Sequence, residues 1–155
     1  MSALFSLTGP EVVDHLIKLG IAYALALPIG WTQERAERSA GLRTFPLVAL
    51  ASCGLMLIAL QMFKGSAEAE ARVLEGLITG IGFIGGGAIL KNSHAAYGTA
   101  TAASVWNVGA IGAASAYGLY DIAFILSVVN LATLRLLKPF KQEDVKADGA
   151  KGGAA

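Results

Sequence analysis

This sequence has few charged residues and only one cysteine. Charged residues make up 15% of its 155 residues, and the single cysteine, Cys53, stands inside an apolar run. One cysteine forms no intrachain disulfide and no cysteine-rich metal site. The formal net charge is +1, whereas a nucleic-acid-binding protein carries a concentrated basic face. The composition therefore argues against nucleic acid as a partner.

Hydrophobic residues are abundant instead. They make up 55% of the chain, and the mean hydropathy is +0.60. Residues 45–63, 76–90 and 92–120 contain no Lys, Arg, Asp or Glu. Helices of soluble proteins rarely run so far without charge, and membrane lipid is the better solvent for such segments. We therefore expect an all-α, polytopic membrane protein.

Five apolar segments approach the roughly 20 residues that a helix needs to cross about 30 Å of hydrocarbon. They are residues 16–33, 46–63, 73–90, 99–117 and 122–137. We expect residues 1–141 to form one transmembrane helical bundle. Residues 142–155 are rich in Lys, Asp, Gly and Ala, a composition that buries too little apolar surface to fold, and they are predicted to be a disordered cytoplasmic tail.

The basic residues beside the five segments predict the orientation. Lys and Arg are enriched in cytoplasmic loops. In a five-span chain one side receives Arg35, Arg38, Arg43, Lys91, Arg135, Lys138 and Lys141. The opposite side has only Lys18, Lys64 and Arg72 near the span ends. This pattern predicts an external N-terminus and a cytoplasmic C-terminus.

The third segment is rich in glycine. Residues 80–85 read GIGFIG, which matches the GxGxxG fingerprint of dinucleotide sites. Such a site also requires an Asp or Glu about 20 residues after the glycines. This chain has no Asp or Glu between Glu75 and Asp121. The pairs Gly76/Gly80 and Gly82/Gly86 have the GxxxG spacing that allows close helix packing. Three consecutive glycines, residues 85–87, leave open a helix break or a close approach of backbone to a ligand.

The fourth segment begins with small residues and contains polar ones. The segment starts at Thr99. Thr101, Ser104 and Asn107 are each three residues apart, and this spacing places these three residues on one broad helix face. Two interpretations are open, namely hydrogen bonds between helices and a path for a ligand.

Glu75 is a carboxylate within a predicted span, and Thr79 follows it one turn later. Ionisable groups inside membranes indicate functional sites by default. Glu75 also lies near the predicted external end of its span, where it could reach headgroup water or pair with Arg72. Both interpretations are kept.

The loop between the first two spans contains Glu34, Arg35, Gly41, Arg43 and Thr44. Glu34 and Arg35 end the first span, and Arg43 stands at the mouth of the second. We expect Arg43 to cap free carbonyls of a neighbouring helix or to pair with Glu34 in a desolvated junction.

Three ordered motifs resemble the MgtC/SapB family of bacterial inner-membrane proteins. They are AGLRT at residues 40–44, GIGFIGGGAIL at 80–90 and TATAASVW at 99–106. The resemblance covers roughly residues 20–137, and Thr32 and Gln33 stand where Glu and Arg are usual. It implies a link to growth under magnesium limitation and to virulence, and the chain looks like a short, SapB-like form without the soluble C-terminal domain of MgtC.

Our main hypothesis is a non-enzymatic membrane protein without a cofactor that modulates magnesium or other ion homeostasis. It would act through helix contacts with itself, as a homodimer, or with another inner-membrane protein. The alternative is a small ion transporter or channel, with Mg²⁺ as a ligand or transported ion and a polar path between spans three and four. That path would be lined by Glu75, Thr79, Thr101, Ser104 and Asn107, with Glu75 as the possible metal ligand. An enzyme finds no support, because His15 and His94 are predicted near opposite membrane faces, without an evident nucleophile or metal cluster.

Overall fold

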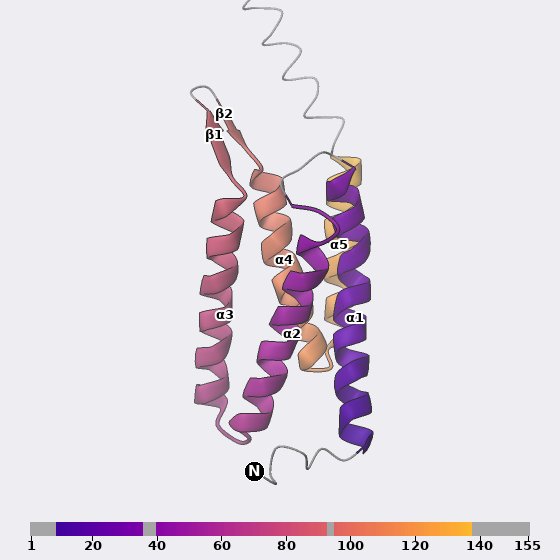
Figure 1. Ribbon diagram of the computed structural model, residues 1–155, viewed down its shortest axis with the longest axis vertical. Helices are drawn as coiled ribbons and strands as arrows, with labels where there is room; N and C mark the ends of the chain where they lie inside the picture. Colours follow the sequence, from indigo (N-terminus) through magenta and orange to yellow (C-terminus); the bar gives the residue numbers. More distant parts are fainter. Residues whose placement is uncertain (1–8, 36–39, 93–94, 138–155) are drawn as a thin grey trace, which may run out of the picture.

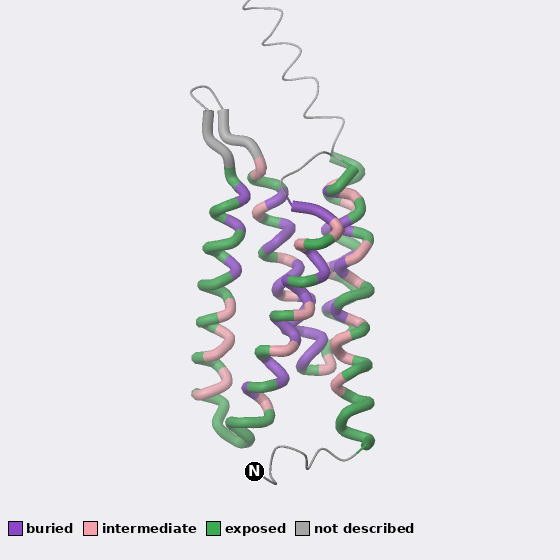
Figure 2. Tube along the Cα trace, in the orientation of Figure 1, coloured by how far each residue is buried: buried purple, intermediate pink, exposed green. Residues whose placement is uncertain are grey.

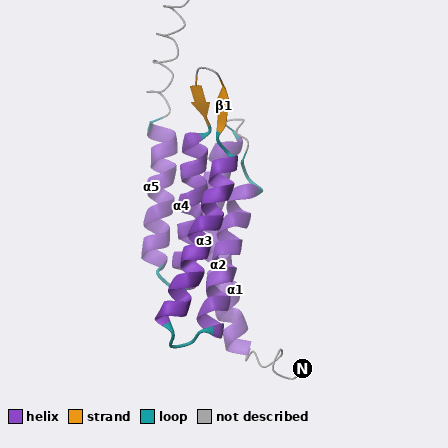
Figure 3. Cartoon of the chain, turned by 90° about the vertical axis from the view of Figure 1, so that its left-hand side faces the viewer, coloured by secondary structure: helices purple, strands orange, loops and turns teal. Residues whose placement is uncertain are grey.

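The computed structural model describes residues 9–35, 40–92 and 95–137. This part of the chain forms five α-helices and one short hairpin, and the helices run antiparallel in a single bundle (Figures 1 and 3). The helices are α1 (Gly9–Glu34), α2 (Thr44–Met62), α3 (Ala67–Gly87), α4 (Thr99–Ala116) and α5 (Tyr120–Leu136). The predicted all-α class and the five helices are confirmed, whereas the predicted tail at residues 142–155 lies outside the described residues.

Two helices begin well before the predicted start of their spans. Helix α1 begins at Gly9 rather than at residue 16, and α3 begins at Ala67 rather than at residue 73. Charged residues extend both helices: Asp14 pairs with Lys18 at 2.8 Å, and Glu68 pairs with Arg72 at 2.8 Å, each at i,i+4. Helices therefore continue beyond the apolar segments from which the spans were read.

A hairpin that the sequence did not indicate follows α3. Strand β1 (Leu90–Asn92) pairs antiparallel with β2 (Ala95–Tyr97). The three glycines at residues 85–87 have weak helix propensity, and α3 ends on the last of them, three residues before the predicted end at 90. After β2, Gly98 has φ +86°, and a Cβ there would collide with the carbonyl oxygen of Ala88. Glycine is required at this position because an L side chain meets both strain and a clash.

The turn from α2 to α3 has its own sequence signals. Gly65 has φ +87°, which glycine adopts without a steric penalty. Ser66 then caps α3, because its hydroxyl accepts the N–H of Ala69 at 3.4 Å. Glu68 and Glu70 lie in the first turn, where carboxylates interact favourably with the helix dipole.

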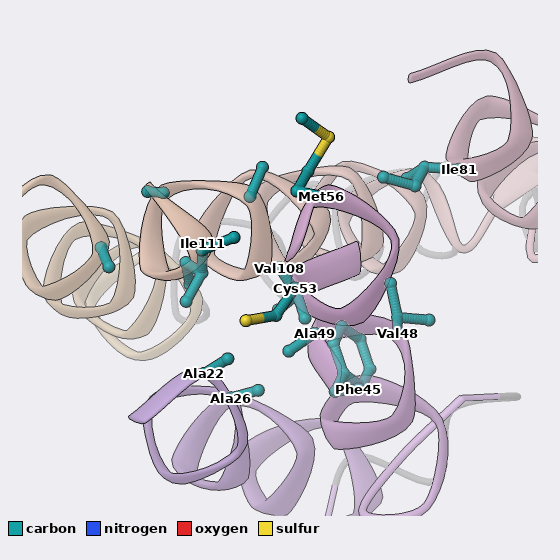
Figure 4. Packing of buried hydrophobic residues seen from close by; sticks show 14 of the residues in the cluster. Ala22, Ala26, Phe45, Val48, Ala49, Cys53, Met56, Ile81, Val108 and Ile111 are labelled. Atoms are coloured by element: carbon teal, nitrogen blue, oxygen red, sulfur yellow. The ribbon is translucent and has the colours of Figure 1, made fainter. Parts of the chain in front are cut away.

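Helix α4 lies at the centre of the bundle and contacts all four other helices (Figure 2). Large side chains that are fully buried on or around α4 include Phe45, Met56, Val108 and Ile111 (Figure 4). Ile29 and Val105 are also fully buried. Small residues on α4 permit this close packing. A Cβ on Gly112 would lie 2.8 Å from the Ser52 Cβ and collide with the carbonyl oxygen of Ala49, and a Cβ on Gly109 would collide with Ile81. These two glycines set how closely α2 and α3 approach α4.

The outside of the bundle is apolar. Large hydrophobic side chains are exposed on every helix, including Leu16, Leu47, Phe83, Trp106 and Phe124. Scattered apolar residues are normal on soluble proteins, but an apolar surface on every helix is typical of a protein in lipid. Helices α1 and α2 are long and apolar enough to cross a membrane by length and composition. Five spans and the orientation of the termini stay predictions.

Candidate functional site on the third helix

Four predicted site residues lie on one exposed stripe of α3. Glu75, Thr79, Gly82 and Gly86 are spaced by four, three and four residues, which places them on one helix face. All four are exposed. A Cβ added at Gly82 or Gly86 would meet no atom within 4 Å. We call these four residues the α3 stripe.

The glycines of the stripe do not pack against this chain. The pair Gly82/Gly86 therefore makes no close helix contact within the described bundle, and Gly76 and Gly80 are equally open. Close packing of the pair Gly82/Gly86 against a second chain stays a prediction. Gly85 is the glycine that packs, since a Cβ there would lie 3.3 Å from the carbonyl oxygen of Ala102. The stripe is bordered by Phe83, whose side chain is 85% exposed.

The polar groups of the stripe differ in their local bonding. The Thr79 hydroxyl donates to the backbone carbonyl of Glu75 at 2.9 Å, so this hydroxyl is satisfied within its own helix. Arg72 pairs with Glu68 at 2.8 Å, so of the two alternatives for Glu75, headgroup water or a pair with Arg72, the described structure does not form the pair. Within the described ranges the Glu75 carboxylate has no hydrogen bond or ion pair, and it faces outward.

The polar residues of α4 differ in their burial and in their bonding partners. Thr101 and Ser104 are buried, and Ser104 donates to the Asn130 Oδ1 on α5 at 3.0 Å. Asn107 is half-buried, and its Oδ1 has no partner among the described residues. Thr99 is exposed at the first turn of α4. For Ser104, the interpretation as a hydrogen bond between helices is the one that the structure shows.

In the described structure, the groove between α3 and α4 has an apolar lining. A groove of about 240 Å³ lies between these helices. Its lining consists of Leu74, Leu77, Ile78, Ile81, Trp106, Gly109, Ala110 and Ala113. Glu75 and Thr79 lie on the outer stripe, and Thr101 and Ser104 are buried. None of the five residues predicted to form a path between spans three and four lines this groove, and the path stays a prediction.

The loop before α2 folds back on the end of α1. The Glu34 Oε2 accepts the backbone N–H of Leu42 at 3.0 Å, and the carbonyl of Gly41 accepts the N–H groups of Thr44 and Phe45 at 3.0 and 3.2 Å. Arg43 is exposed, and in the described part of the chain it forms no ion pair with Glu34. The predicted pair is wrong because a backbone N–H takes its place.

Arg35 and the GxGxxG segment do not form a ligand site in the described structure. The Arg35 guanidinium lies 5.2 Å from the centre of the Trp31 ring, a cation–π contact on the same helix. Residues 80–85 lie inside α3, without the strand and loop that a dinucleotide site needs before its helix. Within the described residues no three His, Cys, Asp or Glu side chains group as metal ligands.

Comparison with models of protein families identifies the family of this chain. The model of the MgtC family matches residues 19–143, which include all of α2 to α5 and most of α1. The chain belongs to the MgtC family. This is a family of bacterial membrane proteins, so the apolar exterior of the bundle is that of a membrane protein.

Relatives named for the family support this assignment. The chain is 33% identical to Protein MgtC of Brucella suis over 121 residues, which are 78% of this chain and 50% of the relative. It is 30% identical to Protein SapB of Bacillus subtilis over 105 residues, 63% of this chain and 45% of the relative. Protein SrpB of Synechococcus elongatus is 32% identical over 111 residues, 60% of this chain and 61% of the relative. No solved structure matches the chain.

The chain spans about half the length of the curated relatives that it matches. SapB, like MgtC, extends beyond the matched region, so the two matches do not separate a short SapB-like form from a long MgtC-like form. The shared part is the helical bundle, which contains every predicted site residue.

Several buried polar residues of this MgtC family member were not predicted as site residues. Asn130 on α5 accepts from Ser104, and Ser127 on α5 donates to the Leu25 carbonyl on α1 at 2.8 Å. The Asn130 Nδ2 and the Gln33 Nε2 are buried without a partner in the described structure. The lone amide of Asn130 in an apolar segment was the available signal, because polar groups within a membrane span face the bundle interior.

Proposed function

We propose that this MgtC family protein acts in magnesium or other ion homeostasis without catalysing a reaction, by binding a helix of another membrane protein at the α3 stripe. Family membership supports the physiological role. The observation that carries the binding site is the exposure of Gly82 and Gly86, which contact no other element of the described bundle.

The physical argument rests on what holds helices together in lipid. Apolar area does not drive helix association there, and interfaces use small residues that let two backbones approach. Each glycine costs about 1 kcal/mol of helix propensity relative to alanine. Nothing within the described bundle offsets that cost at Gly82 and Gly86. A partner helix packed on the stripe would offset it.

Glu75 favours a partner of different sequence. A carboxylate that faces outward from an apolar helix needs a hydrogen-bond donor or a cation, and the described chain supplies neither. Two copies related by a two-fold axis along the membrane normal would place their Glu75 carboxylates at the same depth on facing stripes. Like charges repel, so we expect a partner helix with Lys, Arg or another donor near Glu75. The homodimer predicted from the sequence becomes an outcome of the test.

The experiment fills the stripe. Gly82→Leu and Gly86→Leu place bulk on it, and Gly20→Leu on α1 is the matched control, because Gly20 is also exposed with nothing within 4 Å of an added Cβ. We expect the stripe variants to fail to support growth at low magnesium, and Gly20→Leu to support it. Growth of both stripe variants like the native protein would overturn the proposal.

Crosslinking identifies what occupies the stripe. A Gly86→Cys protein in a Cys53→Ala background carries one thiol, on the stripe. We expect a crosslink to a different protein, lost in Gly82→Leu and weakened in Glu75→Lys. A crosslink only to a second copy would establish the homodimer and overturn the choice of a different partner.

A further inference from the structure

A groove on the other side of α3 separates this helix from α2. Its volume is about 790 Å³, within the range of roughly 300–1,000 Å³ for pockets that hold small molecules. Apart from Arg43, Thr44 and Ser52, its lining is apolar or glycine. The groove shares no residue with the α3 stripe.

Two polar groups without partners stand at one end of this groove. Arg43 is the residue before α2 and is exposed, and Thr44 is the first residue of the helix. Neither side chain has a hydrogen bond or an ion pair in the described ranges. The carboxylate of Glu34 is engaged by the N–H of Leu42. Arg43 is therefore a cation without a described partner at one end of the apolar groove.

The groove has the length of one membrane leaflet. Along α2 it runs from Thr44 to Leu55, which is about 17 Å at 1.5 Å per residue. Half of the hydrocarbon thickness of a bilayer is about 15 Å. With Arg43 at the headgroup level, the far end of the groove lies near the bilayer centre, where the acyl chains of that leaflet end.

The lining of the groove suits a lipid chain. An extended acyl chain is much thinner than a helix, which is about 10–12 Å wide. Such a chain makes only apolar contacts, and the groove offers these along both α2 and α3. The glycines Gly76 and Gly80 line the groove and add no side chain to it at these two positions of α3.

We propose that the groove between α2 and α3 binds an anionic phospholipid, with one acyl chain along the groove and the phosphate at Arg43 and Thr44. Arginine forms strong charge-assisted bonds to phosphate. The surrounding end of the bundle is predicted to carry the basic residues of the protein, which attract anionic lipid. This site is independent of the partner proposed for the α3 stripe.

The test measures lipid binding by the full chain. Native mass spectrometry of the protein with added phosphatidylglycerol or phosphatidylethanolamine counts bound lipids. We expect preferential binding of phosphatidylglycerol. Arg43→Gln should weaken it about fivefold, the effect of one basic group at a lipid surface, and Arg43→Lys should keep most of it. Equal affinity of the native protein and Arg43→Gln for phosphatidylglycerol would overturn the proposal.

A second pair of variants tests the groove itself. Gly80→Leu fills the groove and should abolish binding of both lipids. Gly82→Leu lies on the stripe of the same helix and should bind lipid like the native protein. Both glycines have open space around an added Cβ, so both variants should fold, which thermal unfolding checks. Lipid binding that survives in Gly80→Leu, or a crosslink from Gly80→Cys to another protein instead of to lipid, would count against the site.

Discussion

The carboxylate of Glu34 accepts the backbone N–H of Leu42 at 3.0 Å, and this contact joins the last residue of α1 to the loop before α2. Gly41 makes the contact possible. A Cβ at Gly41 would collide with the Glu34 Oε2 and would lie 2.9 Å from its Cδ. Gly30 supports the same junction, since a Cβ there would lie 3.2 Å from the carbonyl oxygen of Gly41.

Gly41→Ala should displace the Glu34 carboxylate and lower the free energy of unfolding by about 1 kcal/mol. This is less than the roughly 1.5–3 kcal/mol of hydrogen bonds to charged groups, because Glu34 is exposed. Thermal unfolding in detergent measures the change. In a double-mutant cycle, Gly41→Ala should cost little more once Glu34→Ala is present. Additive losses would show that the methyl group acts elsewhere.

Arg43→Ala should leave unfolding in lipid-free detergent within about 1 kcal/mol of the native protein. Its side chain is exposed and forms no ion pair in the described structure, and exposed charges contribute about 0–1 kcal/mol. The sequence predicted a buried pair, for which the loss would be about 3–5 kcal/mol. Thermal unfolding distinguishes these two values directly.

Gly112→Ala should lower the free energy of unfolding by about 1–3 kcal/mol, the usual cost of overpacking. The added Cβ meets the backbone carbonyl of Ala49, which has no freedom to rotate away. Gly54→Ala on α2 is the control, because no atom lies within 4 Å of its Cβ and alanine gains up to about 1 kcal/mol of helix propensity. Equal unfolding of the two variants would show that α2 and α4 are less closely packed than described.

Ser104→Ala should cost about 0.6–1.7 kcal/mol, the range of hydrogen bonds between membrane helices. It removes the donor to Asn130 and leaves a second atom of that buried amide without a partner. Ser104→Ala with Asn130→Leu should recover stability, because it removes both polar partners together. A double variant less stable than Ser104→Ala would show that Asn130 has a further role.

The five-span topology should place residue 155 in the cytoplasm. In the described bundle the ends of α1, α3 and α5 lie at the same end as the starts of α2 and α4 (Figure 1), which brings the loops with most Lys and Arg together. Reporter fusions at residue 155 and in the turn at residues 63–66 should give opposite signals. An external signal at residue 155 contradicts the prediction.

The sequence by itself determined the class, the number of helices and the approximate position of each, because long apolar runs form helices wherever backbone groups must be satisfied internally. It also identified the residues of the α3 stripe, since helical spacing places them on one face. Only the tertiary structure decided which faces meet. The glycine pair Gly82/Gly86 predicted a contact, yet the packing of α3 on α4 uses Gly85 and Gly109. Likewise Glu34 binds a backbone N–H rather than Arg43, because backbone donors produced by the fold compete with side chains and leave no signal in the sequence.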